Sequence, residues 1–198
     1  MHEALVFDYD GVIADTEPLH WRSWAALLSR CGIQLGWDEY CRIGQGVSDA
    51  AIFEHFREQA PQWDAAEFAF QNRERKQMVR AWALAESPIQ PETGALLKTL
   101  GAYRLGLVTS SDKAEVEPVL RAAQIYDCFD AMVYGEEPEA PKPSPAPYLL
   151  IAERLGVKSG TAFEDSAPGL ASARAAGFRA VEIPRASDLP QIVAITLR

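Results

Sequence analysis

The chain has 198 residues, of which 48% are hydrophobic and 24% are charged, and its formal net charge is −9. This length and composition exclude a disordered tail and predict one hydrophobic core with room for a small second domain. The acidic balance argues against a general affinity for nucleic acid, which depends on Lys and Arg residues that neutralise phosphates.

No export or membrane signal is recognisable in the sequence. The N-terminus leads directly into a strand-like segment, without the basic and apolar regions of a signal peptide, and no apolar run approaches the roughly 18 residues of a membrane span. The three cysteines, Cys31, Cys41 and Cys128, form neither a zinc motif nor an even disulfide framework. We therefore expect a cytoplasmic protein with reduced thiols and no membrane partner.

The first predicted strand covers residues 4–7 and is followed by Asp8-Tyr9-Asp10-Gly11. In an open parallel sheet, ligands bind beyond the carboxyl ends of the strands. Two carboxylates at that place predict a polar crevice, and Gly11 permits the sharp turn that would direct both acids into it. The same pattern also occurs in calcium loops and in plain turns, so by itself it leaves the chemistry open.

The region that follows has no convincing strand pattern and is helical almost throughout, with a long helix predicted over residues 68–82. The segment 87–91 contains two prolines and marks a boundary. We therefore predict an all-helical cap domain at residues 17–87, inserted into a core formed by residues 1–16 and 88–198. A small domain at this position would act as a lid.

Beyond the cap, strand-like runs alternate with helical patterns. The runs cover residues 105–108, 131–133, 161–163 and 180–183. The helical patterns cover residues 93–100, 113–123, 145–155 and 168–176, the last of them closed by Gly177. Each run is largely apolar rather than alternating, as in parallel strands that are covered on both faces. The alternation predicts an α/β fold with a Rossmann-like parallel sheet.

Two polar motifs lie in this core, one of them directly after a predicted strand. Thr109, Ser110 and Ser111 follow residues 105–108, where hydroxyls and backbone N–H groups can hold phosphate oxygens. Such residues also cap helices, so this motif alone is a weak indication. Lys142 stands between two prolines that restrict its backbone, and by itself it is compatible with a fixed cation or with a solvated surface lysine.

A second pair of acids, Glu164 and Asp165, follows the predicted strand over residues 161–163. Adjacent carboxylates repel each other unless a cation holds them. Hard oxygen ligands in octahedral geometry suit Mg²⁺. The pair therefore indicates a magnesium site at the carboxyl edge of the sheet.

Four motifs thus occur in the order Asp-x-Asp, Thr/Ser, Lys and Glu-Asp, each at or just beyond the carboxyl end of a strand. This order resembles the haloacid dehalogenase superfamily over nearly the whole length of the chain. The helical insertion after the first strand resembles the branch with a helical C1 cap, which includes enzymes similar to β-phosphoglucomutase and phosphoglycolate phosphatase. The resemblance implies a Mg²⁺-dependent hydrolase of a small phosphomonoester, such as a sugar phosphate or phosphoglycolate.

The resemblance also implies a role for each catalytic residue. Asp8 would be the nucleophile that forms an aspartyl-phosphate. Asp10 would be the general acid that protonates the leaving oxygen, and then the base that activates water. Thr109 and Lys142 would neutralise charge on the transferring group, because positioning and electrostatics supply most of the catalysis in phosphoryl transfer.

Ligands for the metal and the substrate follow from the same resemblance. Mg²⁺ would be bound by the carboxylates of Asp8 and Asp165 and by the backbone carbonyl of Asp10, with Glu164 supporting them. The candidate substrate-binding residues are Ser110, Ser111, His20, Gly46, Arg75 and Lys76. His20 is also explained as a partly buried helix residue, and Gly46 as part of an ordinary helix-helix turn, whereas Arg75 and Lys76 could supply positive charge from the later cap helix. We expect a small phosphorylated metabolite as the partner, and a monomer.

A sugar-phosphate mutase is the main alternative. Thr16, Glu17 and His20 resemble the β-phosphoglucomutase-like subgroup, in which an Arg after a Gly-Val-Ser stretch of the cap holds the distal phosphate of the substrate. This chain has Gly46-Val47-Ser48-Asp49 instead. An acid at this place would repel a second phosphate, which favours a phosphatase.

Two further alternatives are a dehalogenase and a catalytically silent binding protein on the same fold. A dehalogenase would lack the second acid of the first motif and would not need a metal. A silent protein is disfavoured because all four motifs are retained. Three departures from the family pattern bear on this alternative: Tyr9 is bulky, Pro141 replaces a common Gly, and Ala146 replaces a common acid.

Overall fold

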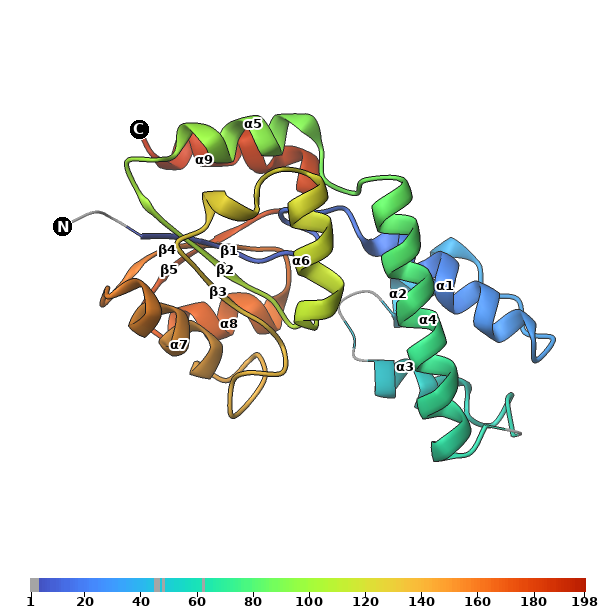
Figure 1. Cartoon of the computed structure of the whole chain (residues 1–198). Coiled ribbons are helices and arrows are strands. Elements are labelled where there is room, and N and C mark those ends of the chain that lie inside the picture. Colours follow the sequence, from blue (N-terminus) through green and yellow to red (C-terminus); the bar gives the residue numbers. More distant parts are fainter. Residues whose placement is uncertain (1–3, 45–46, 48, 62) are drawn as a thin grey trace. The chain divides into compact units, whose positions relative to one another are not determined.

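The computed structural model describes residues 4–44, 47, 49–61 and 63–198. The chain forms two compact units, each with its own core (Figure 1). One unit joins Met1–Asp15 to Ser87–Arg198, and the other, here called the helical unit, is Thr16–Glu86. The sequence predicted the helical unit at residues 17–87, so each expected boundary lies one residue later than the boundary between the two units.

The larger unit is built on a parallel sheet in the order β3-β2-β1-β4-β5. Its strands are β1 (Ala4–Phe7), β2 (Arg104–Val108), β3 (Ala131–Val133), β4 (Gly160–Glu164) and β5 (Arg179–Glu182). In the central strand β1, Phe7 pairs with Leu107 on one side and with Phe163 on the other. All four residues of β1 are buried, which explains why this run is apolar on both faces. The predicted Rossmann-like fold class is confirmed.

Helices cover both faces of this sheet (Figure 1). One face carries α7 (Ala146–Leu155) and α8 (Ala167–Ala175), and the other carries α5 (Pro91–Thr99) and α9 (Leu189–Thr196). Between β2 and β3 the chain forms α6 (Lys113–Ala122) and the short 3₁₀ helix η1 (Tyr126–Cys128), and η2 (Ala186–Asp188) precedes α9. The sequence does not predict α9, because its Ile, Val and Thr residues favour strands as much as helices.

The helical unit contains α1 (Glu17–Ser29), α2 (Trp37–Ile43), α3 (Asp49–Phe56) and α4 (Ala65–Ala85) among the described residues. Asp64 caps α4 by accepting hydrogen bonds from the N–H groups of Ala66 and Glu67 at 2.9 and 2.8 Å. The core of this unit combines aromatic and aliphatic side chains: Trp24, Leu27, Leu28, Leu35, Tyr40, Ile52, Phe56, Ala60 and Trp63. No helix in the described part of the chain is both long and apolar enough to cross a membrane.

Candidate active site

Asp8 and Asp10 lie in the turn that follows the central strand β1. The N–H of Asp8 donates to the carbonyl oxygen of Phe163 at 3.0 Å, which extends the pairing of β1 with β4 by one residue. The chain then turns, and the N–H groups of Ile13 and Ala14 both donate to the carbonyl oxygen of Tyr9. Two carboxylates are thereby held at the carboxyl edge of the sheet, where ligands bind in this kind of fold.

Gly11 lets this turn approach the second pair of acids. Its φ angle is +74°, in the left-handed region that favours glycine. A β-carbon at this position would overlap the carboxylate of Asp165. The turn after β1 and the end of β4 therefore meet more closely than any other residue type at position 11 would allow.

Lys142 lies between two of the acids. Its Nζ is 2.6 Å from Oδ1 of Asp8 and 2.6 Å from Oε1 of Glu164, and it also donates to the carbonyl oxygen of Val108 at 3.2 Å. The side chains of Lys142 and Asp8 are only 7% and 8% exposed, and that of Glu164 is fully buried. The interior thus holds a cation shared by two anions.

Burial and the neighbouring charges shift the pKa values of Lys142 and Asp8. Burial opposes the charged amine, but the carboxylates of Asp8 and Glu164 outweigh it and raise the pKa of Lys142. Burial also raises the pKa of Asp8; Lys142 opposes that shift, while the nearby acids Glu164, Asp165 and Asp10 add to it. Lys142 is therefore charged at neutral pH, and added positive charge at this cluster would favour the ionised form of Asp8.

A divalent metal fits the same cluster. Carboxylate oxygens of Asp8, Glu164 and Asp165 all lie within 4.8 Å of one another. Hard oxygen donors of this kind are the ligands of small divalent cations, and a bound cation reverses the repulsion between crowded carboxylates. The donor set therefore suits the metal that the two acidic motifs indicated.

The Thr109 to Ser111 motif contacts Asp10. The hydroxyl of Ser111 donates to Oδ2 of Asp10 at 2.7 Å, and that of Thr109 donates to the same oxygen at 3.4 Å. The backbone N–H of Ser111 donates to Oγ1 of Thr109 at 2.9 Å, which fixes the Thr109 hydroxyl against the turn. Ser110 is exposed. Phosphate binding by Ser110 and Ser111 stays a prediction, and the observed contact of Ser111 is with an acid.

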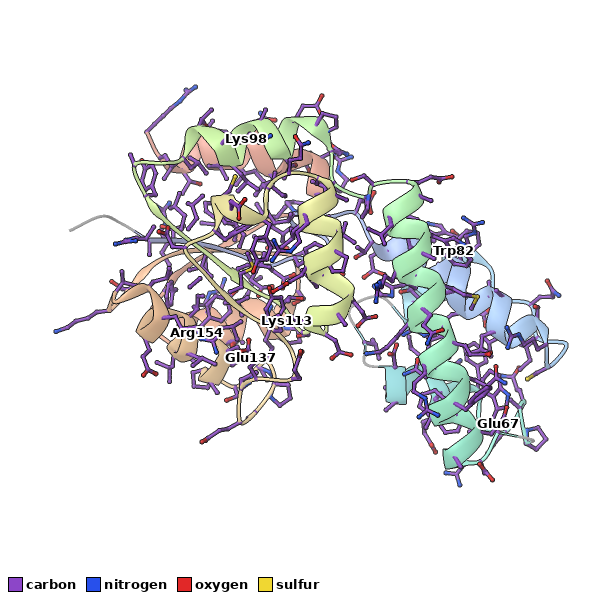
Figure 2. All side chains as sticks on the ribbon, in the orientation of Figure 1. Glu67, Trp82, Lys98, Lys113, Glu137 and Arg154 are labelled. Atoms are coloured by element: carbon purple, nitrogen blue, oxygen red, sulfur yellow. The ribbon has the colours of Figure 1, made fainter. Side chains whose placement is uncertain are left out.

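The loop that carries Lys142 is anchored where it leaves β3. Arg154 on α7 donates from Nη2 and Nη1 to the two carboxylate oxygens of Glu137, at 2.7 and 3.1 Å, and also to the carbonyl oxygen of Met132. Figure 2 shows Arg154 and Glu137 next to each other. Glu137 in turn accepts the N–H of Tyr134 at 2.8 Å. These contacts restrain the loop before it reaches the buried lysine.

Two polar residues that the sequence does not single out, Tyr148 and Ser166, contact Glu164. The hydroxyl of Tyr148 donates to Oε1 of Glu164 at 2.7 Å, and that of Ser166 lies 3.4 Å from Oε2. Tyr148 belongs to the apolar stripe of α7, together with Ile151 and Leu155, so its burial was visible in the helical pattern. Its hydrogen bond to Glu164 was not visible in the sequence, because Glu164 lies on a different element.

The predicted substrate-binding residues of the cap have different environments. Arg75 on α4 is 1% exposed, and its guanidinium pairs with Asp49 at 2.6 Å and donates to Ser23 at 3.1 Å. His20 on α1 lies 3.4 Å from Arg75, and Lys76 is half-buried on α4. Gly46 lies outside the described residues. We therefore expect Arg75 to stabilise the helical unit from within rather than to bind substrate.

The family profile of haloacid dehalogenase-like hydrolases matches residues 5–183. The chain belongs to this family. Among curated haloacid dehalogenase-like relatives, it is 33% identical to the phosphorylated carbohydrates phosphatase of Thermotoga maritima, over 90% of this chain and 83% of that protein. It is 31% identical to the fructose-1-phosphate phosphatase YqaB of Escherichia coli, over 92% of this chain and 96% of that protein.

Solved structures of haloacid dehalogenase-like proteins share the fold. The β-phosphoglucomutase of Clostridium difficile superimposes with a TM-score of 0.77 over the whole of both chains, at 23% identity, a likeness that shows the fold alone. The family and its curated phosphatases identify this chain as a phosphoric monoester hydrolase, which confirms the predicted enzyme class. Enzymes of this family generally use a divalent metal, and the chain has an acidic cluster suited to one.

Gly11→Ala tests the tight approach of Gly11 to Asp165. We expect phosphatase activity to fall by about a hundredfold or more, because the added methyl group would displace the carboxylate of Asp165 from the acidic cluster. The control is Gly177→Ala, since Gly177 has a φ of +87° and no atom within 4 Å of the added carbon. Urea denaturation should show a loss of about 1 kcal/mol in Gly177→Ala from the left-handed backbone, and a larger loss in Gly11→Ala, where the overlap with Asp165 adds to it. Equal losses of activity in Gly11→Ala and Gly177→Ala would show that the close approach of Gly11 to Asp165 is not the cause.

Arg75→Met separates a structural role of Arg75 from substrate binding. Removing the guanidinium takes the charged partner from Asp49, which keeps a hydrogen bond from Asn72 at 3.2 Å, and takes the donor from Ser23. We therefore expect the free energy of unfolding to fall by about 2 kcal/mol, with Asp49 partly rehydrated. Urea denaturation measures this loss, and Arg73→Met, an exposed position on the same helix, is the control. Unchanged stability with a strongly raised KM would instead assign Arg75 to the substrate.

Proposed function

We propose that this chain is a Mg²⁺-dependent phosphatase of a small phosphorylated sugar, and that Asp8 is its nucleophile. The observation that carries the proposal is the buried ammonium of Lys142, 2.6 Å from Asp8, beside a cluster of three carboxylates. A lone nucleophilic carboxylate would repel a phosphate dianion, whereas this cluster offers a fixed cation and a metal site next to it. The names of the two curated phosphatases support a phosphorylated carbohydrate as the substrate.

The residues that would hold Mg²⁺ are Asp8, Asp165 and the backbone carbonyl of Asp10, with Glu164 supporting them. When bound, Mg²⁺ supplies positive charge that offsets the repulsion between the phosphate and the carboxylates and stabilises charge in the transition state. Glu164 accepts hydrogen bonds from Lys142 and Tyr148, so we expect it to act mainly by holding its neighbours in place.

The proposed reaction has two steps. In the first, a carboxylate oxygen of Asp8 attacks phosphorus, the ester P–O bond breaks, and the carboxylic acid of Asp10 gives its proton to the departing sugar oxygen. In the second, the carboxylate of Asp10 takes a proton from water, the water oxygen attacks phosphorus, and the bond to Asp8 breaks. The ammonium of Lys142 neutralises charge on the phosphoryl group in both steps, and the hydroxyl of Thr109 stabilises it by donating a hydrogen bond.

We further propose that the helical unit acts as a cap that excludes water and selects the substrate. The two chain segments that lead to this unit are tied by a hydrogen bond from the N–H of Asp15 to the carbonyl oxygen of Pro88, at 2.9 Å. Such a narrow connection allows hinge motion, since few residues need to change conformation. We propose that His20 and Lys76 contact substrate from this unit.

The mutase alternative has less support. A mutase needs a cation in the cap for a second phosphate, and this chain has Asp49 after the Gly-Val-Ser stretch. The carboxylate of Asp49 pairs with Arg75 at 2.6 Å, so the charge of this arginine is already neutralised inside the helical unit. A phosphatase, which handles a single phosphate, does not require such a cation.

Asp8→Asn tests the nucleophile. We expect phosphate release to fall to background, because the amide cannot form the aspartyl-phosphate. The fold should persist, as measured by circular dichroism and urea denaturation, since the side chain keeps its shape. Asp127→Asn, at an exposed position of η1, is the matched control and should retain full activity.

In the wild type, borohydride reduction of the acyl-phosphate should yield homoserine at position 8, located by mass spectrometry. Activity in Asp8→Asn comparable to wild type would overturn the mechanism.

Substrate and metal are tested together by phosphate release from fructose 1-phosphate, β-glucose 1-phosphate and phosphoglycolate, each with Mg²⁺ and with EDTA. We expect release from the sugar phosphates that EDTA abolishes and that added Mg²⁺ restores. Formation of glucose 6-phosphate from β-glucose 1-phosphate, followed in the same samples, measures mutase activity. Glucose 6-phosphate without free phosphate would assign the chain to the mutases. Release that is unaffected by EDTA would refute the metal requirement.

A further inference from the structure

Tyr148 is a buried phenol at the reactive cluster that the proposed mechanism does not use. Its exposed fraction is 0%, and its hydroxyl donates to Oε1 of Glu164 at 2.7 Å. The same oxygen accepts the ammonium of Lys142 at 2.6 Å. The Nζ of Lys142 also lies 5.7 Å from the centre of the Tyr148 ring. One carboxylate oxygen therefore receives two donors, one neutral and one charged.

Glu164 is confined on its other side as well. The hydroxyl of Ser166 lies 3.4 Å from Oε2, and the same hydroxyl caps α8 by accepting the N–H of Gly169 at 3.2 Å. A β-carbon on Gly169 would overlap the carboxylate of Glu164. The first turn of α8 is thus packed directly against this side chain. The carboxylate of Glu164 therefore accepts hydrogen bonds from Lys142, Tyr148 and Ser166 in a tightly packed site.

The position of Lys142 depends on the balance between its two carboxylate partners. Asp8 and Glu164 each hold its ammonium at 2.6 Å, so the stronger acceptor of the two would draw it closer. The hydrogen bond from Tyr148 satisfies part of the charge on Glu164 and so weakens the pull of Glu164 on the lysine. Without that hydroxyl, a fully buried carboxylate would lose a donor and take a larger share of Lys142.

We propose that Tyr148 is a positioning residue whose hydroxyl holds Glu164 so that Lys142 stays at Asp8. The inference rests on the proposed function, because Lys142 matters for catalysis only if Asp8 is the nucleophile. The contact between Tyr148 and Glu164 does not depend on that function. Tyr148 therefore affects the reaction through Glu164 and Lys142, without touching the reacting atoms itself.

Tyr148→Phe removes the hydroxyl and keeps the ring, which packs against Phe178 at a centroid distance of 5.6 Å. The matched control is Tyr126→Phe: the hydroxyl of Tyr126 also donates to a glutamate, Glu117, at 3.2 Å, on other elements of the same unit. We expect Tyr148→Phe to lower kcat by about tenfold, as is typical when a supporting hydrogen bond behind an active group is lost. KM should change less, and Tyr126→Phe should leave both unchanged. Unchanged kinetics in Tyr148→Phe would overturn the proposal.

A double-mutant cycle separates positioning from a general loss of packing. If Tyr148 acts through Glu164, then adding Tyr148→Phe to Glu164→Gln should reduce kcat no further than Glu164→Gln alone. Losses that multiply would mean that Tyr148 acts independently of Glu164. Urea denaturation of the single and double variants checks that each protein is folded under the conditions in which kcat is measured.

The position of Lys142 can also be followed without substrate or metal. The chain has five lysines, so the ammonium groups are few enough for ¹⁵N NMR, with Lys142→Arg to assign the signal. We expect the Lys142 signal to move in Tyr148→Phe and to stay in place in Tyr126→Phe. No movement in Tyr148→Phe would refute the proposal. A wild type that is inactive on every phosphate ester, combined with a moved signal, would refute the proposed function and leave the coupling of Tyr148 to Lys142 intact.

Discussion

The active site depends on one buried ammonium group. Three carboxylates cluster at the end of the sheet, and two of them belong to almost fully buried side chains. Burial of like charges is unfavourable unless a cation and hydrogen bonds compensate for lost hydration. Lys142 provides that compensation within the chain by contacting Asp8, Glu164 and the last carbonyl oxygen of β2. The surrounding strands and loops bring Lys142 and the carboxylates together at the carboxyl edge of the sheet.

The sheet order supplies this convergence. Because β1 lies between β2 and β4, the residues that follow these strands are neighbours in space, and the loop after β3 returns the lysine to the same edge. Close approach requires that some positions carry no side chain. Gly11 lies against Asp165, and Gly169 lies against Glu164. The backbone of the turn after β1 and that of the first turn of α8 therefore both contact the acids directly. The geometry is therefore maintained by packing, and a change of one methyl group is expected to disturb it.

The helical unit is stabilised by different means. Its core contains several aromatic side chains, and a stacked pair of partly buried rings, Phe53 and Phe68, packs against it with ring centres 4.0 Å apart. It also buries Arg75, whose guanidinium connects α1, α3 and α4 through Ser23, Asp49 and Asn72. A buried arginine with several fixed acceptors sets the relative positions of the helices that carry them. We infer that these contacts keep α1, α3 and α4 in one arrangement within the unit.

The sequence by itself determined the parallel sheet, the helical insertion and the four motifs, because strand runs, helical periodicity and turn residues are local patterns. It located Asp8, Lys142 and Glu164 as candidates, but their mutual contacts join residues as far as 134 positions apart. Only the tertiary structure decided that Ser111 donates to Asp10, that Arg75 is buried, and that Tyr148 shares a carboxylate oxygen with Lys142. These outcomes depend on which side chains meet when helices and strands pack, and periodicity within one element carries no information about the partner on another.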